Sequence, residues 1–143
     1  MKFHQGKFKP KFPQKYNGDV NKIQYRSSWE LQVFVYMDKN PDIVSWNSEE
    51  VVVPYISPID GRRHRYFVDV WMKNRKGAIY LIEIKPAAQS KPPKKKSRVT
   101  KKYLNEVKTW GVNSAKWVAA TAYCEERGWI FKVITEKDLF KWK

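Results

Sequence analysis

Apolar residues recur at helical spacing in the segment of residues 27–39, where Val33 and Met37 would share one face. Ser27 is followed three residues later by Glu30, which is the pattern of a capping box. In that motif the two side chains satisfy backbone amides that the first helical turn leaves free. The segment therefore predicts a helix that buries one of its faces.

Shorter patterns of β-branched or alternating residues predict three strands in the middle of the chain. Residues 51–57 are a β-branched run suited to a strand, and the turn-forming residues 58–61 follow it. Residues 64–73 and 78–85 alternate on either side of a turn over residues 74–77, as the two arms of a hairpin do. Both faces of this hairpin carry apolar side chains, so we expect it to lie at the centre of the sheet.

The second half of the chain predicts further helices after a loop over residues 86–97, which is rich in Pro and Lys. A helix over residues 98–110 would end at Gly111, because glycine favours the left-handed conformation found at helix ends. Another helix would follow over residues 114–127 and end at Gly128.

The chain closes with a strand over residues 129–134 and a short helix capped by Thr135 and Asp138. The order of elements is then helix, three strands, helices, strand and helix. Such an order predicts a mixed α/β (α+β) domain with helices packed on a small mixed sheet. A chain of 143 residues fits one core, so we expect a single domain over residues 21–143.

Residues 1–20 differ in composition from the rest of the chain. Their lysines alternate with aromatic residues, and the first acidic residue is Asp19. Pro10 and Pro13 oppose helix formation. We expect a basic flexible arm over residues 1–20. The alternative is an arm that becomes ordered on contact with DNA or a partner.

The charge balance favours a polyanionic partner. Lys and Arg number 29 against 14 Asp and Glu, which gives a net charge of +15. Such an excess is typical of proteins that bind nucleic acid or an anionic membrane surface. No apolar stretch approaches the roughly 18 residues that a membrane-spanning helix needs, and the N-terminus lacks the apolar run of a signal peptide. We therefore expect DNA as a partner and no membrane.

The residue types that bind metals narrow the choice of cofactor. Cys124 is the only cysteine, which excludes an intramolecular disulfide and favours a reducing compartment. His4 and His64 are isolated, so no zinc site can be assembled from them. A catalytic metal would have to bind oxygen ligands, which favours Mg²⁺ or Mn²⁺.

The predicted hairpin carries charged side chains among apolar ones. Glu83 and Lys85 share a strand face with Leu81, and Asp69 shares a face with Trp71. An uncompensated buried charge costs several kcal/mol. A divalent cation held by Asp69 and Glu83 would remove that cost, activate water and neutralise charge on a phosphate. Lys85 could then orient or deprotonate the water, or stabilise the phosphorus centre.

Each of these residues also has a purely structural interpretation. Asp69 could form an ion pair with Lys85, while Glu83 faces solvent at a strand end. Glu30 could serve only as the reciprocal half of the capping box. It also lies at the rim of the buried helix face, from which it could reach a metal at the edge of the sheet. The residues alone leave these alternatives open.

Strand parity makes a geometric prediction about the hairpin loop. Asp69 and Glu83 can hold one metal only if their side chains leave the same face of the sheet. A two-residue loop would pair Asn74 with Gly77 and send the carboxylates to opposite faces. A three-residue loop pairs Asn74 with Ala78 and keeps them on one face. Gly77 suits the left-handed last position of such a loop, so we predict three loop residues.

Basic residues flank the candidate site in sequence, where contacts to phosphates belong. No aromatic code for reading bases is evident, so we expect little sequence specificity. The candidate DNA-binding residues are Arg26, Arg62, Arg63, Arg65, Lys94, Lys95, Lys96, Arg98, Lys101 and Lys102.

Three motifs together resemble a known superfamily. They are Tyr25-Arg-Ser-Ser-Trp-Glu30, then Tyr66-Phe-Val-Asp69, then Leu81-Ile-Glu-Ile-Lys-Pro86. They resemble the PD-(D/E)xK nucleases, in the branch shared by Tn7-type transposon end-cutting endonucleases and the head-completion nucleases of large tailed phages. The resemblance spans roughly residues 21–140, and its one departure is a valine in place of the proline before Asp69.

The resemblance implies a restriction-endonuclease-like core of helix, three strands, helix and strand. It implies Glu30, Asp69, Glu83 and Lys85 as catalytic residues, with Asp69 and Glu83 as metal ligands and Glu30 as a further candidate ligand. Mg²⁺ or Mn²⁺ would be the cofactor. The resemblance does not define the oligomeric state.

The compact length resembles the phage branch. It implies a DNA endonuclease in phage head completion and virion assembly, with DNA and head or portal proteins as partners. The host cytoplasm or the virion would then be its location. The alternative is a non-catalytic basic protein on the same fold that binds DNA or seals a portal.

Overall fold

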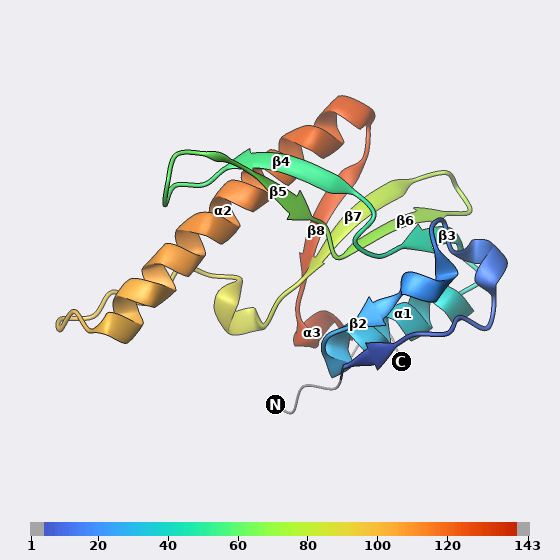
Figure 1. Cartoon of the computed structure of the whole chain (residues 1–143), viewed down its shortest axis with the longest axis horizontal. Coiled ribbons are helices and arrows are strands. Elements are labelled where there is room, and N and C mark those ends of the chain that lie inside the picture. The colour runs from blue at the N-terminus through green and yellow to red at the C-terminus, as the bar shows by residue number, and fades with distance from the viewer. Residues whose placement is uncertain (1–4, 140–143) are drawn as a thin grey trace.

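A four-stranded mixed sheet forms the centre of the computed structural model, which describes residues 5–139 (Figure 1). In chain order the elements are β1 (Gly6–Lys7), the 3-10 helices η1 (Pro13–Lys15) and η2 (Val20–Lys22), β2 (Gln24–Tyr25), α1 (Ser28–Lys39), β3 (Ile43–Asn47), β4 (Val52–Ile56), β5 (Arg63–Phe67), β6 (Val70–Asn74), β7 (Ile79–Ile84), the 3-10 helix η3 (Ala87–Gln89), α2 (Lys101–Arg127), β8 (Ile130–Ile134) and α3 (Glu136–Leu139).

The sheet has the strand order β3-β6-β7-β8. β6 runs antiparallel to both β3 and β7, whereas β8 runs parallel to β7. The predicted hairpin strands β6 and β7 are therefore the two central strands, as expected. This is the predicted mixed α/β architecture, and its arrangement is consistent with a restriction-endonuclease-like fold.

Hydrophobic cores cover both faces of the sheet. On one face, Val33 and Phe34 of α1 pack with Ile82 and Ile84 of β7. On the other face, α2 and the β4–β5 hairpin pack against Leu81. Neighbouring residues of β7 thus alternate between the two cores, as strand geometry requires.

Helix α1 begins as predicted. Ser27 is its N-cap, and the Ser27 hydroxyl accepts a hydrogen bond from the Glu30 amide at 3.1 Å. In a capping box the Glu30 carboxylate would accept a hydrogen bond from the Ser27 amide. Here it accepts one from the amide of Arg26 instead, at 3.3 Å. Glu30 therefore supports the chain just before the helix.

The segment of residues 64–73 is not one strand, in contrast to the prediction. β5 ends at Phe67 and pairs with β4 in a separate two-stranded sheet, whereas β6 starts at Val70 and pairs with β3 and β7. The alternation of apolar residues continues through the break, so it cannot reveal a change of partner. Asp69 lies in this break, where the two sheets diverge.

The loop of the β6–β7 hairpin has the predicted three residues. The Asn74 amide donates to the Ala78 carbonyl at 3.0 Å, and Gly77 is left-handed with φ +86°. Trp71 faces Leu81 and Val70 faces Ile82 across the pair. Asp69 and Glu83 are the next positions in this register, so they leave the same face.

The two helices expected around Gly111 are one continuous helix of 27 residues, α2. A single glycine inside a helix costs only about 1 kcal/mol, which packing of the helix against the sheet can offset. Thr100 caps its start and Gly128, with φ +71°, ends it as predicted. The first half of α2 projects beyond the sheet (Figure 1).

The N-terminal segment also differs from the expected flexible arm. Phe8 and Tyr16 are buried, and their rings meet Trp46 edge-on with centroids 5.9 and 4.8 Å away. The amides of Lys11 and Phe12 donate to the buried Asp38 carboxylate at 2.8 and 3.1 Å. Residues 5–20 are thus packed on the domain, and residues 1–4 lie outside the described residues.

Candidate active site

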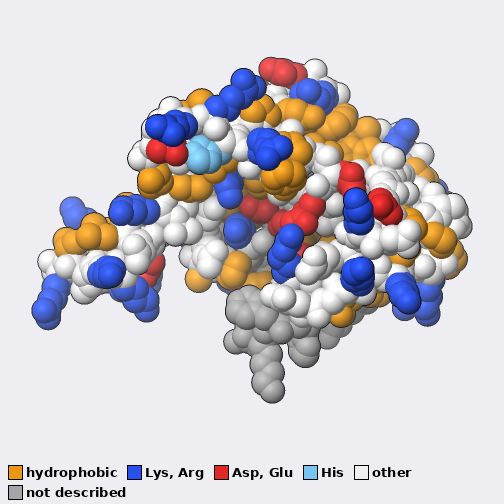
Figure 2. Space-filling model, viewed as in Figure 1, with side chains coloured by type: hydrophobic (Ala, Val, Ile, Leu, Met, Phe, Trp, Pro, Cys, Tyr) orange, Lys and Arg blue, Asp and Glu red, His pale blue; other side chains and the backbone are white. Residues whose placement is uncertain are grey.

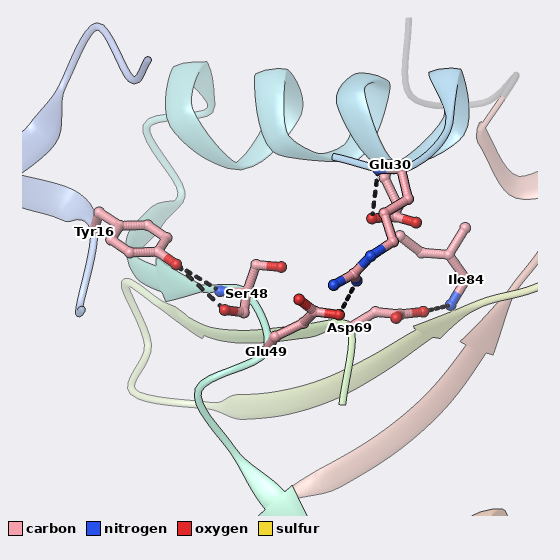
Figure 3. A network of polar contacts seen from close by, with 7 residues as sticks. Tyr16, Glu30, Ser48, Glu49, Asp69 and Ile84 are labelled. Atoms are coloured by element: carbon pink, nitrogen blue, oxygen red, sulfur yellow. Dashed lines mark hydrogen bonds and ion pairs between the residues drawn. The ribbon is translucent and has the colours of Figure 1, made fainter. Parts of the chain in front are cut away.

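The two central acidic residues are held where β6 begins and β7 ends. The Asp69 carboxylate accepts a hydrogen bond from the Ile84 amide at 2.8 Å, which ties the sheet break to β7 (Figure 3). Glu83 precedes Ile84 and is 3% exposed. Its carboxylate accepts from the indole nitrogen of Trp117 on α2 at 3.5 Å. Hydrogen bonds from the strand and from α2 therefore orient both carboxylates.

Glu83 affects the protonation of Asp69. Burial, and next the charge of Glu83, raise the pKa of Asp69 well above its ordinary value. No Lys or Arg within residues 5–139 forms an ion pair with Asp69 or Glu83. The structural alternative, a pair between Asp69 and Lys85 with Glu83 in solvent, is therefore not what the structure shows.

Glu30 reaches the same region from the first turn of α1. Figure 3 shows its side chain directed from α1 toward the strand ends that carry Asp69. Burial raises the pKa of Glu30, and the charges of Glu49 and Glu83 raise it further. The side chain thus both supports the helix start and lies within the field of the acidic cluster.

Lys85 comes directly after β7. Its amide donates to the Ile134 carbonyl of β8 at 2.9 Å, which extends the parallel pairing by one residue. Strand parity places its partly buried side chain on the Glu83 face. Lys85 forms no ion pair with another described residue, so its ammonium group remains available to a substrate.

Glu49, which the sequence prediction missed, lies beside Arg26, a predicted DNA-binding residue. The Arg26 guanidinium is hydrogen-bonded and ion-paired to the Glu49 carboxylate. This hydrogen bond raises the pKa of Arg26, and the charges of Glu30 and Asp69 raise it further. Glu49 has φ +57°, a left-handed conformation that side chains rarely adopt. No motif marks Glu49, because a turn between strands brings it to the site.

Two aromatic residues also adjoin the carboxylates. The Tyr66 hydroxyl is buried and lacks a hydrogen-bond partner among the described residues. Burial, then the charges of Glu83 and Asp69, raise the pKa of Tyr66. The indole nitrogen of Trp117 on α2 donates to Glu83. Tyr66 lies in the Tyr66-Phe-Val-Asp69 motif, but the sequence prediction named neither Tyr66 nor Trp117 as part of the site.

The donor set fits a divalent cation that also takes ligands from outside the chain. Among residues 5–139, no group of three or more His, Cys, Asp or Glu side chains is placed to hold a metal ion. Asp69 and Glu83 are neighbouring carboxylates that form no ion pair with a Lys or Arg in the described part of the chain. Mg²⁺ commonly takes one or two protein carboxylates and fills its remaining positions with water and substrate phosphates. The pair fits that mode of binding.

The candidate DNA-binding residues are all exposed. Figure 2 shows carboxylates gathered at the centre of one face, with Lys and Arg side chains around them and more at the projecting end of the molecule. One basic group lies at β5, another in the loop before α2, and Arg26 lies beside Glu49; the residues are Arg26, Arg62, Arg63, Arg65, Lys94, Lys95, Lys96, Arg98, Lys101 and Lys102.

No helix within residues 5–139 is both long and apolar enough to cross a membrane. No solved structure matches the chain.

Two comparisons with known proteins agree with this arrangement. Residues 40–136 match the family described as TnsA-like endonuclease N terminal. The chain is also similar to the head completion nuclease of Enterobacteria phage T4, with 45% identity over 140 residues, which cover 95% of this chain and 93% of the phage protein. The matched family segment contains Asp69, Glu83 and Lys85, together with the basic loop. The chain belongs to the TnsA-like endonuclease family, in the branch that includes the phage head completion nuclease.

Proposed function

We propose that the protein is a divalent-metal-dependent endonuclease that hydrolyses phosphodiester bonds in DNA. The observation that carries the proposal is the pair of neighbouring carboxylates of Asp69 and Glu83 at the end of the central hairpin, which no Lys or Arg of residues 5–139 neutralises in an ion pair. Burying such a pair is costly unless a cation compensates it. The endonuclease family and the surrounding basic residues favour DNA as the substrate.

Asp69 and Glu83 would hold the metal, with Glu30 as a further candidate ligand; the metal, when bound, activates water and neutralises charge that develops on the phosphate. The Ile84 amide and the Trp117 indole keep Asp69 and Glu83 in place, so these ligands need little reorganisation. Mg²⁺ or Mn²⁺ suits this all-oxygen set.

Two cations would act directly on the substrate. Lys85, on the Glu83 face, would orient or deprotonate the attacking water or stabilise the charged phosphate oxygens. Arg26, held by Glu49, would position a phosphate group through its planar fork of donors. The exposed Lys and Arg side chains around the site would contact the DNA backbone, which carries no direct sequence information. Little sequence specificity follows.

The biological setting is proposed from the relative. The phage protein is named for head completion, and its similarity covers nearly all of both chains. We propose the same task here, with DNA and proteins of the phage head or portal as partners, in the host cytoplasm or the virion. A non-catalytic DNA-binding or sealing role is the second candidate. The retention of two costly carboxylates beside Lys85 favours catalysis over it.

The test is nicking of supercoiled plasmid by the full chain with Mg²⁺, with Mn²⁺ and with EDTA. Nicking should need a divalent ion and should fall by about a thousandfold in Asp69→Asn, because the variant loses an anionic ligand. Asp42→Asn is the matched control, since Asp42 is exposed and paired with Arg75 away from the site. Wild-type nicking by Asp69→Asn, or nicking in EDTA, would refute the assignment.

A further inference from the structure

A cavity lies between the segment that follows β7 and the first half of α2. Its volume is about 710 Å³. The lining includes Gln89 of η3, Lys91 of the basic loop, and Lys101, Asn105, Trp110 and Asn113 of α2. Cavities that bind small organic groups commonly have about 300–1,000 Å³. The cavity is therefore large enough for a nucleotide.

The lining combines three kinds of chemistry. Trp110 offers the flat apolar surface of an indole ring, and the three lysines of the lining outnumber its one carboxylate, Glu106; these lysines are Lys91, Lys101 and Lys102. Asn113 is 5% exposed and lines the cavity. Its amide can both donate and accept hydrogen bonds, so it can pair with a ligand that has hydrogen-bonding edges.

Only some ligands use all three features. A free phosphate would have no use for the indole, and an apolar molecule would leave the amide unpaired. A nucleobase stacks on an aromatic ring and presents donors and acceptors at its edge, and its phosphate pairs with lysine. The lining therefore matches one nucleotide whose base is not stacked inside a duplex.

The cavity is also connected to the catalytic carboxylates. Trp110 meets Trp117 edge-on with ring centroids 5.7 Å apart, and Trp117 donates to Glu83. The two tryptophans are seven residues apart on α2, roughly 10 Å along the helix axis. That distance corresponds to about three nucleotides of a stacked strand at roughly 3.4 Å each.

We propose that this cavity binds one unpaired nucleotide of the DNA strand, within a few nucleotides of the phosphate that is cleaved. The inference rests on the proposed nuclease function and deepens it. Bases in an intact duplex are stacked and unavailable, so the preferred substrate is DNA with an unpaired strand, such as a fork or an overhang. Intact blunt duplex is then the poorer ligand.

The test is equilibrium binding of the full chain in EDTA, where no cleavage occurs, to a forked oligonucleotide and to a blunt duplex of the same length. The fork carries 2-aminopurine in its unpaired strand. The fork should bind about tenfold more tightly, because stacking one base on an aromatic residue contributes a factor of that order or more. The 2-aminopurine fluorescence should fall on binding.

Three variants assign this preference to the cavity. Trp110→Ala should bring the affinity for the fork to within about twofold of that for the duplex, whereas Trp110→Phe, which still stacks, should retain most of the preference. Leu104→Ala is the control, since Leu104 is an exposed residue of the same helix outside the cavity lining. It should behave as wild type.

Equal binding of fork and duplex by the wild-type protein would overturn the inference, as would a full preference in Trp110→Ala. Plasmid nicking is read out separately. A protein that nicks plasmid but shows no fork preference keeps the proposed function and loses this inference. A protein that prefers forks but never nicks loses the proposed function and keeps the cavity as a nucleotide site.

Discussion

Among single residues, Asp69 and Glu83 bear the largest electrostatic cost of the site. Their carboxylates are adjacent, and Glu83 is almost fully buried. A carboxyl group whose pKa is raised by folding binds its proton more tightly in the folded state. Stability is then lost as the pH rises from the ordinary pKa of the group through its raised value. Without metal, the site therefore destabilises the fold at neutral pH.

Asp69→Asn should accordingly stabilise the metal-free protein while it abolishes cleavage. Asparagine keeps the shape and can still accept from the Ile84 amide, but it removes one of two neighbouring charges. We expect the melting temperature in EDTA at pH 7 to rise by about 3 °C or more, which is about 1 kcal/mol for a domain of this size. Below the ordinary pKa of aspartate the difference should vanish. A less stable variant at pH 7 would contradict this account.

Glu30→Gln separates the structural role of Glu30 from its catalytic one. Glutamine can still accept from the Arg26 amide, so stability should stay within about 0.5 kcal/mol of wild type. The loss of an anionic group near the metal should lower kcat by at least about tenfold. Chemical denaturation and plasmid nicking measure the two effects. Full nicking by a stable variant would leave Glu30 with a capping role alone.

Replacement of Glu49 should raise the stability of the protein and weaken its binding of substrate. Glycine adopts φ +57° without the steric cost that Glu49 bears, so Glu49→Gly should be at least as stable as wild type. It also releases Arg26. We expect KM for DNA to rise about threefold or more with kcat largely retained, as for Arg26→Gln. Wild-type KM in Glu49→Gly would show that the ion pair has no function.

Among the elements, the β6–β7 hairpin and the long helix α2 contribute different parts of the site. The hairpin brings the catalytic carboxylates to one face, and its three-residue loop keeps them in register. Helix α2 supplies Trp117 to the site, and its projecting first half carries the basic loop away from the sheet. The loop should therefore govern DNA binding more than chemistry.

Neutralising Lys94, Lys95 and Lys96 tests this division. The triple glutamine variant should bind DNA more weakly, and the slope of log affinity against log salt should fall by about 0.9 for each DNA phosphate that the loop no longer neutralises. The rate at saturating DNA should change little. The matched control replaces Lys39, Lys73 and Lys76, which are exposed away from the catalytic carboxylates. An unchanged salt slope in the loop variant would show that the three lysines neutralise no DNA phosphates and are only solvated.

For the whole molecule, the site depends on where several packing surfaces meet. Cores on both faces of the sheet hold α1 and α2 against the same central strands. Glu30 therefore reaches the strand ends from one side and Trp117 from the other. The N-terminal segment closes the α1 side through Phe8 and Tyr16, which pack on Trp46. The site is thus assembled from parts of the chain that lie far apart in sequence.

The sequence by itself determined the features that depend on neighbouring residues. The start of α1 at Ser27 and the end of α2 at Gly128 follow from capping chemistry within one turn. The placement of Asp69 and Glu83 on one face follows from strand parity and the length of a single loop. Both kinds of inference depend only on residues close together along the chain, and the structure bears them out.

Only the tertiary structure decided the features that depend on distant partners. The predicted strand is interrupted at Asp69 because β5 and β6 pair with different strands. The alternation of apolar residues cannot show which strand each of them pairs with. Helix α2 continues through Gly111, since a cost of about 1 kcal/mol is small beside the packing of a whole helix. Glu49 and Trp117 reach the site from a turn and from α2, and their contacts with Arg26 and Glu83 depend on how these distant segments pack.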